Sequence, residues 1–207
     1  MKLIEIVHGK YVFQRRVHVL AEHIANWLPH NSKVLDVGCG DGLLDFLIAK
    51  QHREQLEIEG IDVLLREHTH IPVKLFDGTH IPYGDNSFDV VIFVDVLHHT
   101  EHPLILLREA KRIARRSIVF KDHITDDMFA IPTLRFMDWI GNAHYGVALP
   151  YNYQSKLQWD RTFTELGLTV ASWKTNLNLY PLPAHWLFDR NLHFIAKLDV
   201  NKSVTFV

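Results

Sequence analysis

The sequence predicts an α/β protein with a mainly parallel, doubly wound sheet of seven strands and helices on both faces. Short apolar runs typical of buried strands alternate with longer segments of helical periodicity. The run SFDVVIFVDVL at 87–97 begins with a continuous β-branched, apolar stretch, as in a central parallel strand that is buried on both faces. A glycine-rich turn, GCGDG, follows the first strand-like run at 38–42. Alternation of this kind builds βαβ units and therefore a parallel sheet.

The first half of the chain shows this alternation most clearly. Residues 1–29 are predicted to be a helical segment, because apolar residues recur at helical spacing from Val12 to Leu28 and Pro29 ends the pattern. The strands expected after it lie, in order, at 33–38, 56–63, 71–77, 87–97 and 117–122. Helices are expected over 43–51 and 102–114.

After residue 123 the alternation is interrupted. The segment 124–154 is rich in aromatic residues and has no clean strand pattern, so we expect an insert of helices and loops. A helix is predicted over 155–167, with Ser155 as its N-cap and Gly167 just after its end. Two closing strands are expected at 168–174 and 192–198, joined by an irregular connection that contains two prolines.

Length and composition indicate one globular domain over residues 1–207. The chain is 47% hydrophobic and 22% charged, and a protein of this length buries roughly 70% of its unfolded surface. The formal net charge of −2 disfavours nucleic acid as a partner. One cysteine, Cys39, cannot form an internal disulfide, and no apolar run approaches the roughly 20 residues that span a bilayer. We expect a cytoplasmic monomer or homodimer without membrane insertion.

The glycine turn is predicted to bind a ligand, because open α/β sheets bind ligands at the carboxyl ends of their strands. Gly38 and Gly40 permit positive φ and close approach of backbone N–H groups to that ligand. The spacing G-x-G-x-G is one residue short of the dinucleotide pattern, and Asp36 and Asp41 would repel a pyrophosphate. S-adenosylmethionine, which carries a sulfonium and an α-ammonium but no phosphate, suits such an acidic loop better.

VLDVGCGDG resembles the first motif of class I S-adenosylmethionine-dependent methyltransferases. The stretch FDGTHIPYGDNSFDVVIFVDVLHHTEHP, at 76–103, is similar to the small-molecule branch often called methyltransferase type 11. The resemblance covers about residues 30–123, and beyond them only the expected final helix and strand pair. It implies a Rossmann-like fold with an antiparallel last strand and S-adenosylmethionine as the cofactor. The family's glycine pair before the fifth strand is missing, since this chain has RIARRSIVF there.

The resemblance also implies which residues bind the cofactor. Asp62 would accept hydrogen bonds from the ribose hydroxyls, and Asp77 would accept one from the exocyclic amine of adenine. The full set expected at the cofactor comprises Asp36, Gly38, Cys39, Gly40, Asp62, Val63, Asp77, Gly78, Thr79, Val94 and Asp95. For Asp62, Asp77 and Asp95 the alternative is a purely structural role in a turn or helix cap.

Three histidines are candidates for a general base. Methyl transfer is an in-line displacement for which positioning and desolvation supply much of the effect, but an acidic acceptor still needs a base. His98 and His99 follow the fourth strand and His123 follows the fifth, and each is alternatively a capping or hydrogen-bonded histidine. No metal site is expected, because no cysteine or acid cluster with ligand spacing accompanies the histidine pairs.

The acceptor is predicted to lie under the aromatic insert, with His102, Trp139, His144 and Tyr145 as candidate contacts. Those aromatic residues alternatively serve only to pack the insert onto the sheet. The chain lacks the Pro-Pro-aromatic motif of amino-group methylases and the Pro-Cys of cytosine methylases. We therefore expect transfer to O, N or C of a small, partly apolar molecule. The alternatives are a non-catalytic cofactor-binding subunit of a methyltransferase complex and an NAD-type oxidoreductase.

Overall fold

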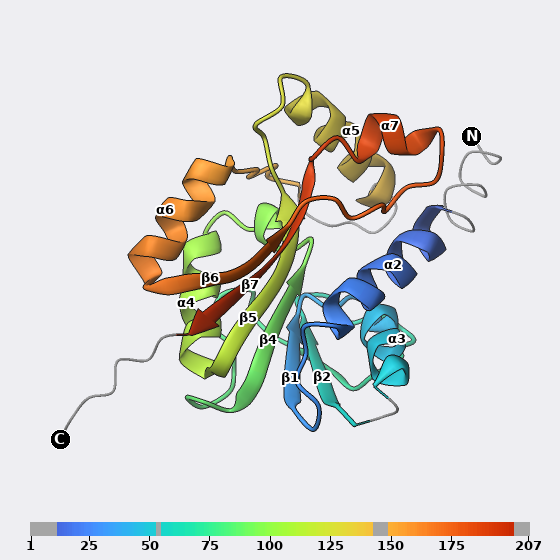
Figure 1. Ribbon diagram of the computed structural model, residues 1–207. Helices are drawn as coiled ribbons and strands as arrows, with labels where there is room; N and C mark the ends of the chain where they lie inside the picture. The colour runs from blue at the N-terminus through green and yellow to red at the C-terminus, as the bar shows by residue number, and fades with distance from the viewer. Residues whose placement is uncertain (1–11, 53–54, 143–148, 201–207) are drawn as a thin grey trace.

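The computed structural model describes residues 12–52, 55–142 and 149–200 (Figure 1). One sheet contains seven strands in the order β3-β2-β1-β4-β5-β7-β6. The strands are β1 (Lys33–Val37), β2 (Glu57–Asp62), β3 (Val73–Leu75), β4 (Phe88–Val94), β5 (Ala114–His123), β6 (Leu168–Lys174) and β7 (His193–Val200). The helices are α2 (Gln14–Ala25), α3 (Leu43–Gln51), the short 3-10 helix η2 (Leu97–His99), α4 (Pro103–Ile113), α5 (Ala130–Asn142), α6 (Lys156–Leu166) and α7 (Ala184–Phe188).

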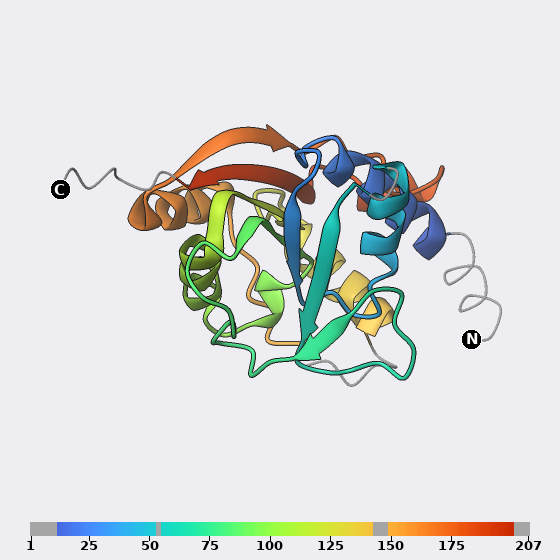
Figure 2. The ribbon, with the colours of Figure 1, turned by 90° about the horizontal axis from the view of Figure 1, so that it is seen from below.

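The sheet is parallel except for β7, which runs antiparallel to both β5 and β6. Both β2 and β4 pair with β1 in parallel, so the strand order reverses beside β1. Figure 2 shows α4 and α6 on one face of the sheet and α2 and α3 on the other. This arrangement confirms the predicted fold class, including the reversed last strand.

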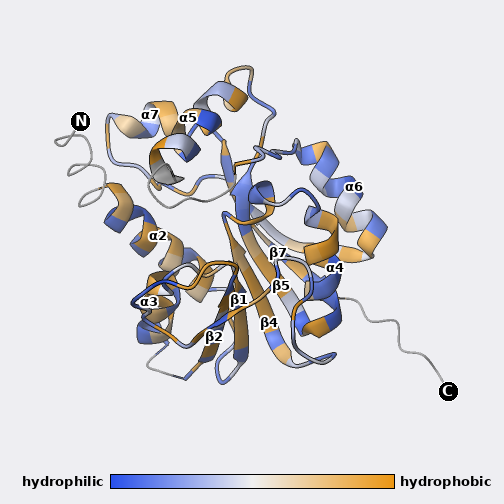
Figure 3. Ribbon diagram, turned by 180° about the vertical axis from the view of Figure 1, so that it is seen from behind, coloured by the Kyte–Doolittle hydropathy of each residue, from blue (hydrophilic) through white to orange (hydrophobic). Residues whose placement is uncertain are grey.

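Strand β4 lies between two hydrophobic cores. Val91 and Phe93 belong to the core under α4 and α6, whereas Val90 and Ile92 belong to the core under α2 and α3. The alternation arises because successive side chains of a strand point to opposite faces. Each such burial stabilises the fold by about 1.5–3 kcal/mol. Figure 3 accordingly shows β1, β2 and β4 as mainly hydrophobic strands.

Several elements differ in extent from the sequence-based expectation. Strand β3 has only three residues, Val73–Leu75, because it is an edge strand that follows Pro72, which has no N–H to donate. Strand β5 extends over ten residues because both β4 and β7 pair with it. The connection between β6 and β7 contains the short helix α7, where an irregular segment was expected.

The predicted ends of helix α6 are confirmed. The Ser155 side chain accepts a hydrogen bond from the backbone N–H of Gln158, and the Gln158 side chain accepts one from the N–H of Ser155. Gly167 follows the helix with a φ of 59°, which suits glycine. The assignment of 1–207 to one domain stays a prediction. Within the described ranges, no helix has the length and apolar character needed to cross a membrane.

Candidate active site

The glycine turn presents its backbone at the carboxyl end of β1. Gly38 and Gly40 have φ values of 79° and 62°, in the region that favours glycine. A Cβ at Gly38 would clash with Val96, whereas one at Gly40 would meet nothing within 4 Å. Gly40 therefore faces open space, where a ligand can approach the main chain.

Asp62, at the end of β2, connects that strand to the glycine turn. Its Oδ2 accepts a hydrogen bond from the Gly40 N–H at 2.8 Å, and its Oδ1 accepts one from the Leu64 N–H at 2.8 Å. Cys39 packs against Gly60 of β2, where any added Cβ would clash with the Cys39 sulfur. Burial raises the pKa of the Cys39 thiol, so the neutral thiol is favoured over the thiolate at pH 7.

Asp77 forms an Asx turn after β3. Its Oδ1 accepts hydrogen bonds from the backbone N–H groups of Thr79 and His80, both at 2.7 Å. These backbone donors hold the pKa of the exposed Asp77 below its ordinary value. A Cβ built on Gly78 would lie 3.2 Å from Val63 Cγ1, so the turns after β2 and β3 are adjacent. Val63 is 59% exposed beside them and offers an apolar surface.

These features fit the cofactor that the sequence implies. Asp36, at 2% exposure, has one carboxylate oxygen without a hydrogen-bond partner in the described part of the chain. The ends of β1 and β2 also present the open main chain of Gly40, the carboxylate of Asp62 and the exposed apolar side chain of Val63. Together they provide acceptors for cationic and hydroxyl groups and an apolar surface for a base.

Asp95 follows β4, but its carboxylate is engaged inside the protein. It forms ion pairs with Arg16 of α2 and Lys121 of β5, and its Oδ1 lies 3.4 Å from Nε2 of His123. Burial alone would raise the pKa of Asp95, but Lys121 and Arg16 hold it well below the ordinary value. Val94, the last residue of β4, packs instead with the core under α2 and α3.

His98 is a fully buried cation. Its Nδ1 hydrogen-bonds Asp122 Oδ1 at 2.7 Å, and its Nε2 lies 3.3 Å from Asp138 Oδ2. Burial alone would lower the pKa of His98, but the two carboxylates raise it to about 10. Tyr153 donates its hydroxyl hydrogen to Asp138. His98 is therefore protonated at neutral pH and cannot act as a base there.

His99 and His123 are neutral by contrast. Burial, followed by the positive charge of Lys121, places the pKa of His123 well below the ordinary value. Burial and the charge on His98 also lower the pKa of His99. The His99 ring lies against His98, with centroids 4.1 Å apart, and its Nδ1 has no hydrogen-bond partner among the residues described. His99 is only half-buried, so it is the accessible neutral histidine of the three.

The predicted acceptor contacts lie outside the buried histidine network or outside the described residues. His102 is exposed at the N-cap of α4, and Trp139 on α5 is 59% exposed. His144 and Tyr145 lie outside the described residues. The structure thus brings the three candidate bases together and leaves His102 and Trp139 at the surface.

Sequence reasoning missed several members of this buried network, namely Arg16, Lys121, Asp122, Asp138 and Tyr153. One signal was available, because Lys121, Asp122 and His123 are consecutive titratable residues inside a buried strand. Charged groups are almost never fully buried unless they are paired. The other partners come from α2, from α5 and from the segment before α6, so only the folded chain identifies them.

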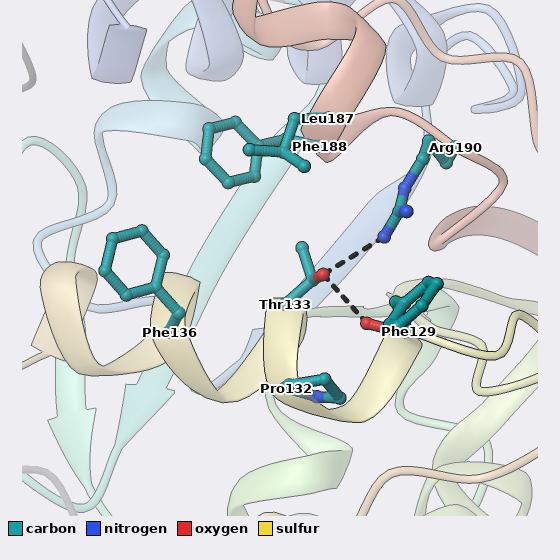
Figure 4. A pocket seen from close by; sticks show the side chains of 7 residues that line it. All are labelled: Phe129, Pro132, Thr133, Phe136, Leu187, Phe188 and Arg190. Carbon is teal, nitrogen blue, oxygen red and sulfur yellow. Dashed lines mark hydrogen bonds between the residues drawn. The ribbon is translucent and has the colours of Figure 1, made fainter.

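An open, mainly apolar pocket of about 360 Å³ lies between helices α5 and α7 (Figure 4). Its walls are Phe129, Pro132, Thr133, Phe136, Leu187, Phe188 and Arg190. Arg190 donates a hydrogen bond to Thr133 Oγ1 at 3.0 Å, and Thr133 Oγ1 donates one to the Phe129 carbonyl at 2.8 Å. The hydrogen-bonded polar groups of the pocket therefore lie together on one side, and aromatic and aliphatic side chains line the rest.

Two groups of three potential metal ligands occur in the histidine network. They are Asp95, His98 and His123, and His98, His99 and Asp138, each within 4.8 Å. In the first group, Arg16 and Lys121 already neutralise Asp95 and would repel a cation. Both groups contain His98, whose proton would have to leave before a metal could bind. We assign no metal here, and the expectation of none stays a prediction.

The sheet has seven strands in this order, its strand β7 is antiparallel to its neighbours, and a glycine turn follows β1. This combination is typical of class I S-adenosylmethionine-dependent methyltransferases. A family model described as a methyltransferase domain matches residues 8–172, which is more than half of the chain. The chain therefore belongs to this methyltransferase family. The cofactor of this family is S-adenosylmethionine, which sets aside the oxidoreductase alternative.

The names of similar proteins point to different acceptors and to different transferred groups. A tRNA U34 carboxymethyltransferase of Nautilia profundicola is 31% identical over 98 residues, which is 40% of this chain and 32% of that protein. The C-methyltransferase UbiE of ubiquinone and menaquinone biosynthesis from Cupriavidus pinatubonensis is 29% identical over 141 residues, 58% of this chain and 57% of UbiE. The chain thus matches between a third and three fifths of the length of these relatives.

A similar solved structure is a complex between the Trm112 methyltransferase activator of Haloferax volcanii and a putative methyltransferase. It has a TM-score of 0.68 and 16% identity, and covers 90% of this chain and 91% of that one. At this identity the likeness shows the fold alone.

These findings correct the predicted partners, which were a small-molecule acceptor, no nucleic acid, and a monomer or homodimer. A tRNA-modifying enzyme is among the relatives, and the Haloferax methyltransferase binds an activator protein. The exclusion of nucleic acid was wrong because it used the net charge of −2 for the whole chain. Binding depends on the local potential of the contact surface, which the summed charge does not give.

Proposed function

We propose that the enzyme methylates an acceptor bound beyond the carboxyl ends of β4 and β5, next to α5, with His99 as the general base. The methyl group arrives on a sulfonium of the cofactor, which makes its carbon electrophilic. His99 would take the proton of the acceptor as the new bond forms and the carbon–sulfur bond breaks, leaving S-adenosylhomocysteine. The observation that carries this proposal is a neutral, half-buried His99 beside a protonated His98.

The cofactor would lie on the adjacent side, over the glycine turn. We retain Asp36, Gly38 and Gly40 for its methionine part and Asp62 for its ribose. The turn at 77–79, together with Val63, is proposed to hold the adenine. The carboxylate of Asp95 is left out, because Arg16 and Lys121 already engage it.

We further propose that the acceptor has an apolar portion. Support comes from the pocket between α5 and α7 and from exposed aromatic side chains on α5, including Phe136 at 50% and Trp139 at 59% exposure. The experiment described next distinguishes a small-molecule acceptor from an RNA acceptor. We retain the cytoplasm as the proposed compartment, on the ground of the single cysteine.

The test uses S-adenosylmethionine with an isotopically labelled methyl group. Wild-type enzyme is incubated separately with a metabolite extract and with total tRNA, and the label is followed into each pool. We expect transfer into one pool, and a reduction of about 10²–10⁴-fold by His99→Gln. His30→Gln is the matched control, because this exposed histidine precedes β1, at the opposite end of the strand from the site, and is expected to retain the rate.

A pH profile of kcat/KM then separates a base from a structural residue. Because the pKa of His99 is lowered, wild-type activity should persist below pH 6.5 and decline only at more acidic pH. Equal turnover by His99→Gln would exclude this histidine as the base. Binding of the cofactor without turnover of any acceptor would instead support the non-catalytic subunit.

A further inference from the structure

Arg190 brings a positive charge to the apolar pocket between α5 and α7. Figure 4 shows its guanidinium extending from the segment after α7 toward Thr133 of α5. The Arg190 side chain is 27% exposed, so solvent, and therefore a ligand, reaches part of it. The side chains around it are aromatic or aliphatic: Phe129, Pro132, Phe136, Leu187 and Phe188. A cation thus borders a wall that offers it no compensating charge.

Arg190 makes few hydrogen bonds for a guanidinium among the described residues. A guanidinium has five N–H donors. Within the described ranges, Nη2 donates to Thr133 Oγ1 at 3.0 Å, and Nε has no hydrogen-bond partner. The Thr133 hydroxyl is neutral and balances no charge. It therefore positions the guanidinium and leaves its positive charge for another group.

Asp127 compensates that charge only in part. Its Oδ1 lies 3.7 Å from Arg190 Nη2, beyond hydrogen-bonding distance, and accepts a hydrogen bond from the Phe129 N–H at 2.9 Å. The Asp127 side chain is 37% exposed, and solvent screens an ion pair at such a position. Asp189, next to Arg190 in the chain, is buried and accepts hydrogen bonds from backbone N–H groups before α7. The cation of the pocket therefore has only a weak partner.

The walls of the pocket favour a ligand with an apolar body. Phe129, Phe136 and Leu187 are each about half exposed, although they line one concave surface. Apolar side chains gathered in this way are typical of a binding site, whereas isolated ones are common on any surface. Covering them removes apolar surface from water, which is favourable. Because the polar groups lie together on one side, the pocket fits a ligand with one polar end.

We propose that this pocket binds a carboxylic acid with an aromatic or aliphatic body, and that Arg190 pairs with its carboxylate. The inference rests on the proposed function, which assigns the pocket to the acceptor, and it adds the chemical class of that acceptor. Arginine suits a carboxylate because its planar N–H groups match the two oxygens. Salt screens such a pair less in a partly enclosed apolar pocket than on an open surface.

An alternative role for Arg190 is that of a tether that joins the segment after α7 to α5 through Thr133. A tether needs a hydrogen-bond donor but no positive charge. Arg190→Gln keeps a side-chain N–H donor and removes the charge, so it separates the two roles. A tether predicts unchanged ligand selectivity in this variant, whereas the acid site predicts that the selectivity is lost.

The test compares three probes that share one body: phenylbutyrate, phenylbutanol and phenylbutylamine. At pH 7 their ends are anionic, neutral and cationic, and ligand-observed NMR titration of the full chain gives each dissociation constant. Wild type should bind phenylbutyrate about tenfold more tightly than phenylbutanol, as expected for a hydrogen bond between charged groups, and phenylbutylamine least tightly. In Arg190→Gln, phenylbutyrate should bind no more tightly than phenylbutanol.

Asp127→Asn is a variant with the opposite expected effect. Asparagine accepts the same hydrogen bond from the Phe129 N–H but no longer competes for the guanidinium of Arg190. Phenylbutyrate should bind about threefold more tightly, within the range of an exposed ion pair, and phenylbutanol should bind as it does to wild type. Weaker binding of phenylbutyrate by Asp127→Asn would contradict the proposed competition and overturn the assignment.

Arg135→Gln is the matched control. Arg135 is an exposed cation on the same helix α5, with its guanidinium 4.6 Å from the centre of the Tyr151 ring, and it does not line the pocket. This variant removes an equal charge and should keep the full preference for phenylbutyrate. Equal loss of preference in Arg135→Gln and Arg190→Gln would indicate a general effect of net charge and refute the site.

A second measurement links the pocket to the acceptor. A metabolite extract is separated by ion exchange into acidic, neutral and basic fractions before incubation with labelled S-adenosylmethionine. We expect the acceptor in the acidic fraction. Arg190→Gln should raise its KM about tenfold and largely retain kcat, because Arg190 contributes binding rather than chemistry. Transfer confined to the neutral fraction, the basic fraction or tRNA would refute the acid as the acceptor.

The outcomes distinguish this inference from the proposed function. Equal affinity of wild type for phenylbutyrate and phenylbutanol, or unchanged selectivity in Arg190→Gln, refutes the acid site and leaves the methyltransferase proposal intact. Selective binding of phenylbutyrate without methyl transfer to any acceptor refutes the proposed function alone. If Arg190→Gln fails to fold, as shown by its thermal unfolding, the wild-type comparison and Asp127→Asn still decide the question.

Discussion

At the residue scale, burial and neighbouring charge decide the chemistry of each titratable group. His98 and His99 are adjacent in the chain, yet Asp122 and Asp138 keep the first protonated while burial keeps the second neutral. The carboxylates differ in the same way. Asp95 forms ion pairs with two cations, whereas another acid, Asp45, neighbours Asp36. Residue type alone therefore assigns no role at this site.

The role of Asp62 can be tested by its effect on cofactor affinity. Asp62→Ala should weaken binding of S-adenosylmethionine at least tenfold, about 1.4 kcal/mol, because it removes a carboxylate at the proposed ribose position. It also removes the acceptor of the Gly40 N–H, which holds the turn in place. Calorimetric titration measures the change. Glu57→Ala, at the opposite end of the same strand, should leave the affinity unchanged, and equal affinity of Asp62→Ala would remove Asp62 from the site.

At the element scale, ionic contacts attach two helices to the carboxyl ends of the strands. Arg16 connects α2 to Asp95 after β4, and Asp138 connects α5 to His98. His98 is linked in turn to Asp122 of β5. The helices that border the proposed acceptor site are thus positioned by the same network that sets the protonation of the histidines.

This network should make stability depend on pH in the alkaline range. The folded-state pKa of His98, about 10, lies above its ordinary value of 6.5. Its stabilisation is therefore complete below pH 6.5 and is lost as the pH rises toward 10. Urea unfolding should show that wild type loses more stability between pH 7 and 9.5 than His98→Gln does.

The control for this experiment is His102→Gln, which changes an exposed histidine outside the network. It should lose stability between pH 7 and 9.5 as much as wild type does. Identical alkaline loss in wild type and His98→Gln would show that His98 is not a cation in the folded state.

At the scale of the whole molecule, the sheet separates two hydrophobic cores, and the site lies at the carboxyl ends of the strands between them. Trp159 and Phe163 of α6 pack against Phe120 of β5, with ring centroids 5.3 and 5.6 Å away. A rigid sheet with both faces covered holds the strand ends, and therefore the site residues, in fixed positions.

Phe163→Ala tests the core under α4 and α6. Phe163 is 2% exposed, so its truncation should lower the free energy of unfolding by about 3–5 kcal/mol. Phe136→Ala is the matched control, since Phe136 is 50% exposed and should cost less than about 1 kcal/mol. Chemical denaturation measures both variants. A similar cost for the two would mean that α6 does not cover a tightly packed core.

Much of the fold follows from local sequence patterns. The apolar run of β4, the glycines at 38–42 and the capping residues of α6 each specify their element through nearby residues. The length of β3 and β5 was harder to predict, because it depends on which strands pair beside them. The partners of His98 come from residues 24 and 40 positions away along the chain, which no local pattern connects.

The sequence by itself determined the class of fold, the position of the glycine turn and the candidate acids at the strand ends. These depend on backbone conformation and on hydrophobic periodicity, which are properties of neighbouring residues. Only the tertiary structure decided that Asp95 is neutralised by Arg16 and Lys121, and that His98 is a cation. The physical reason is that charge and solvation are set by groups that folding brings together from distant parts of the chain.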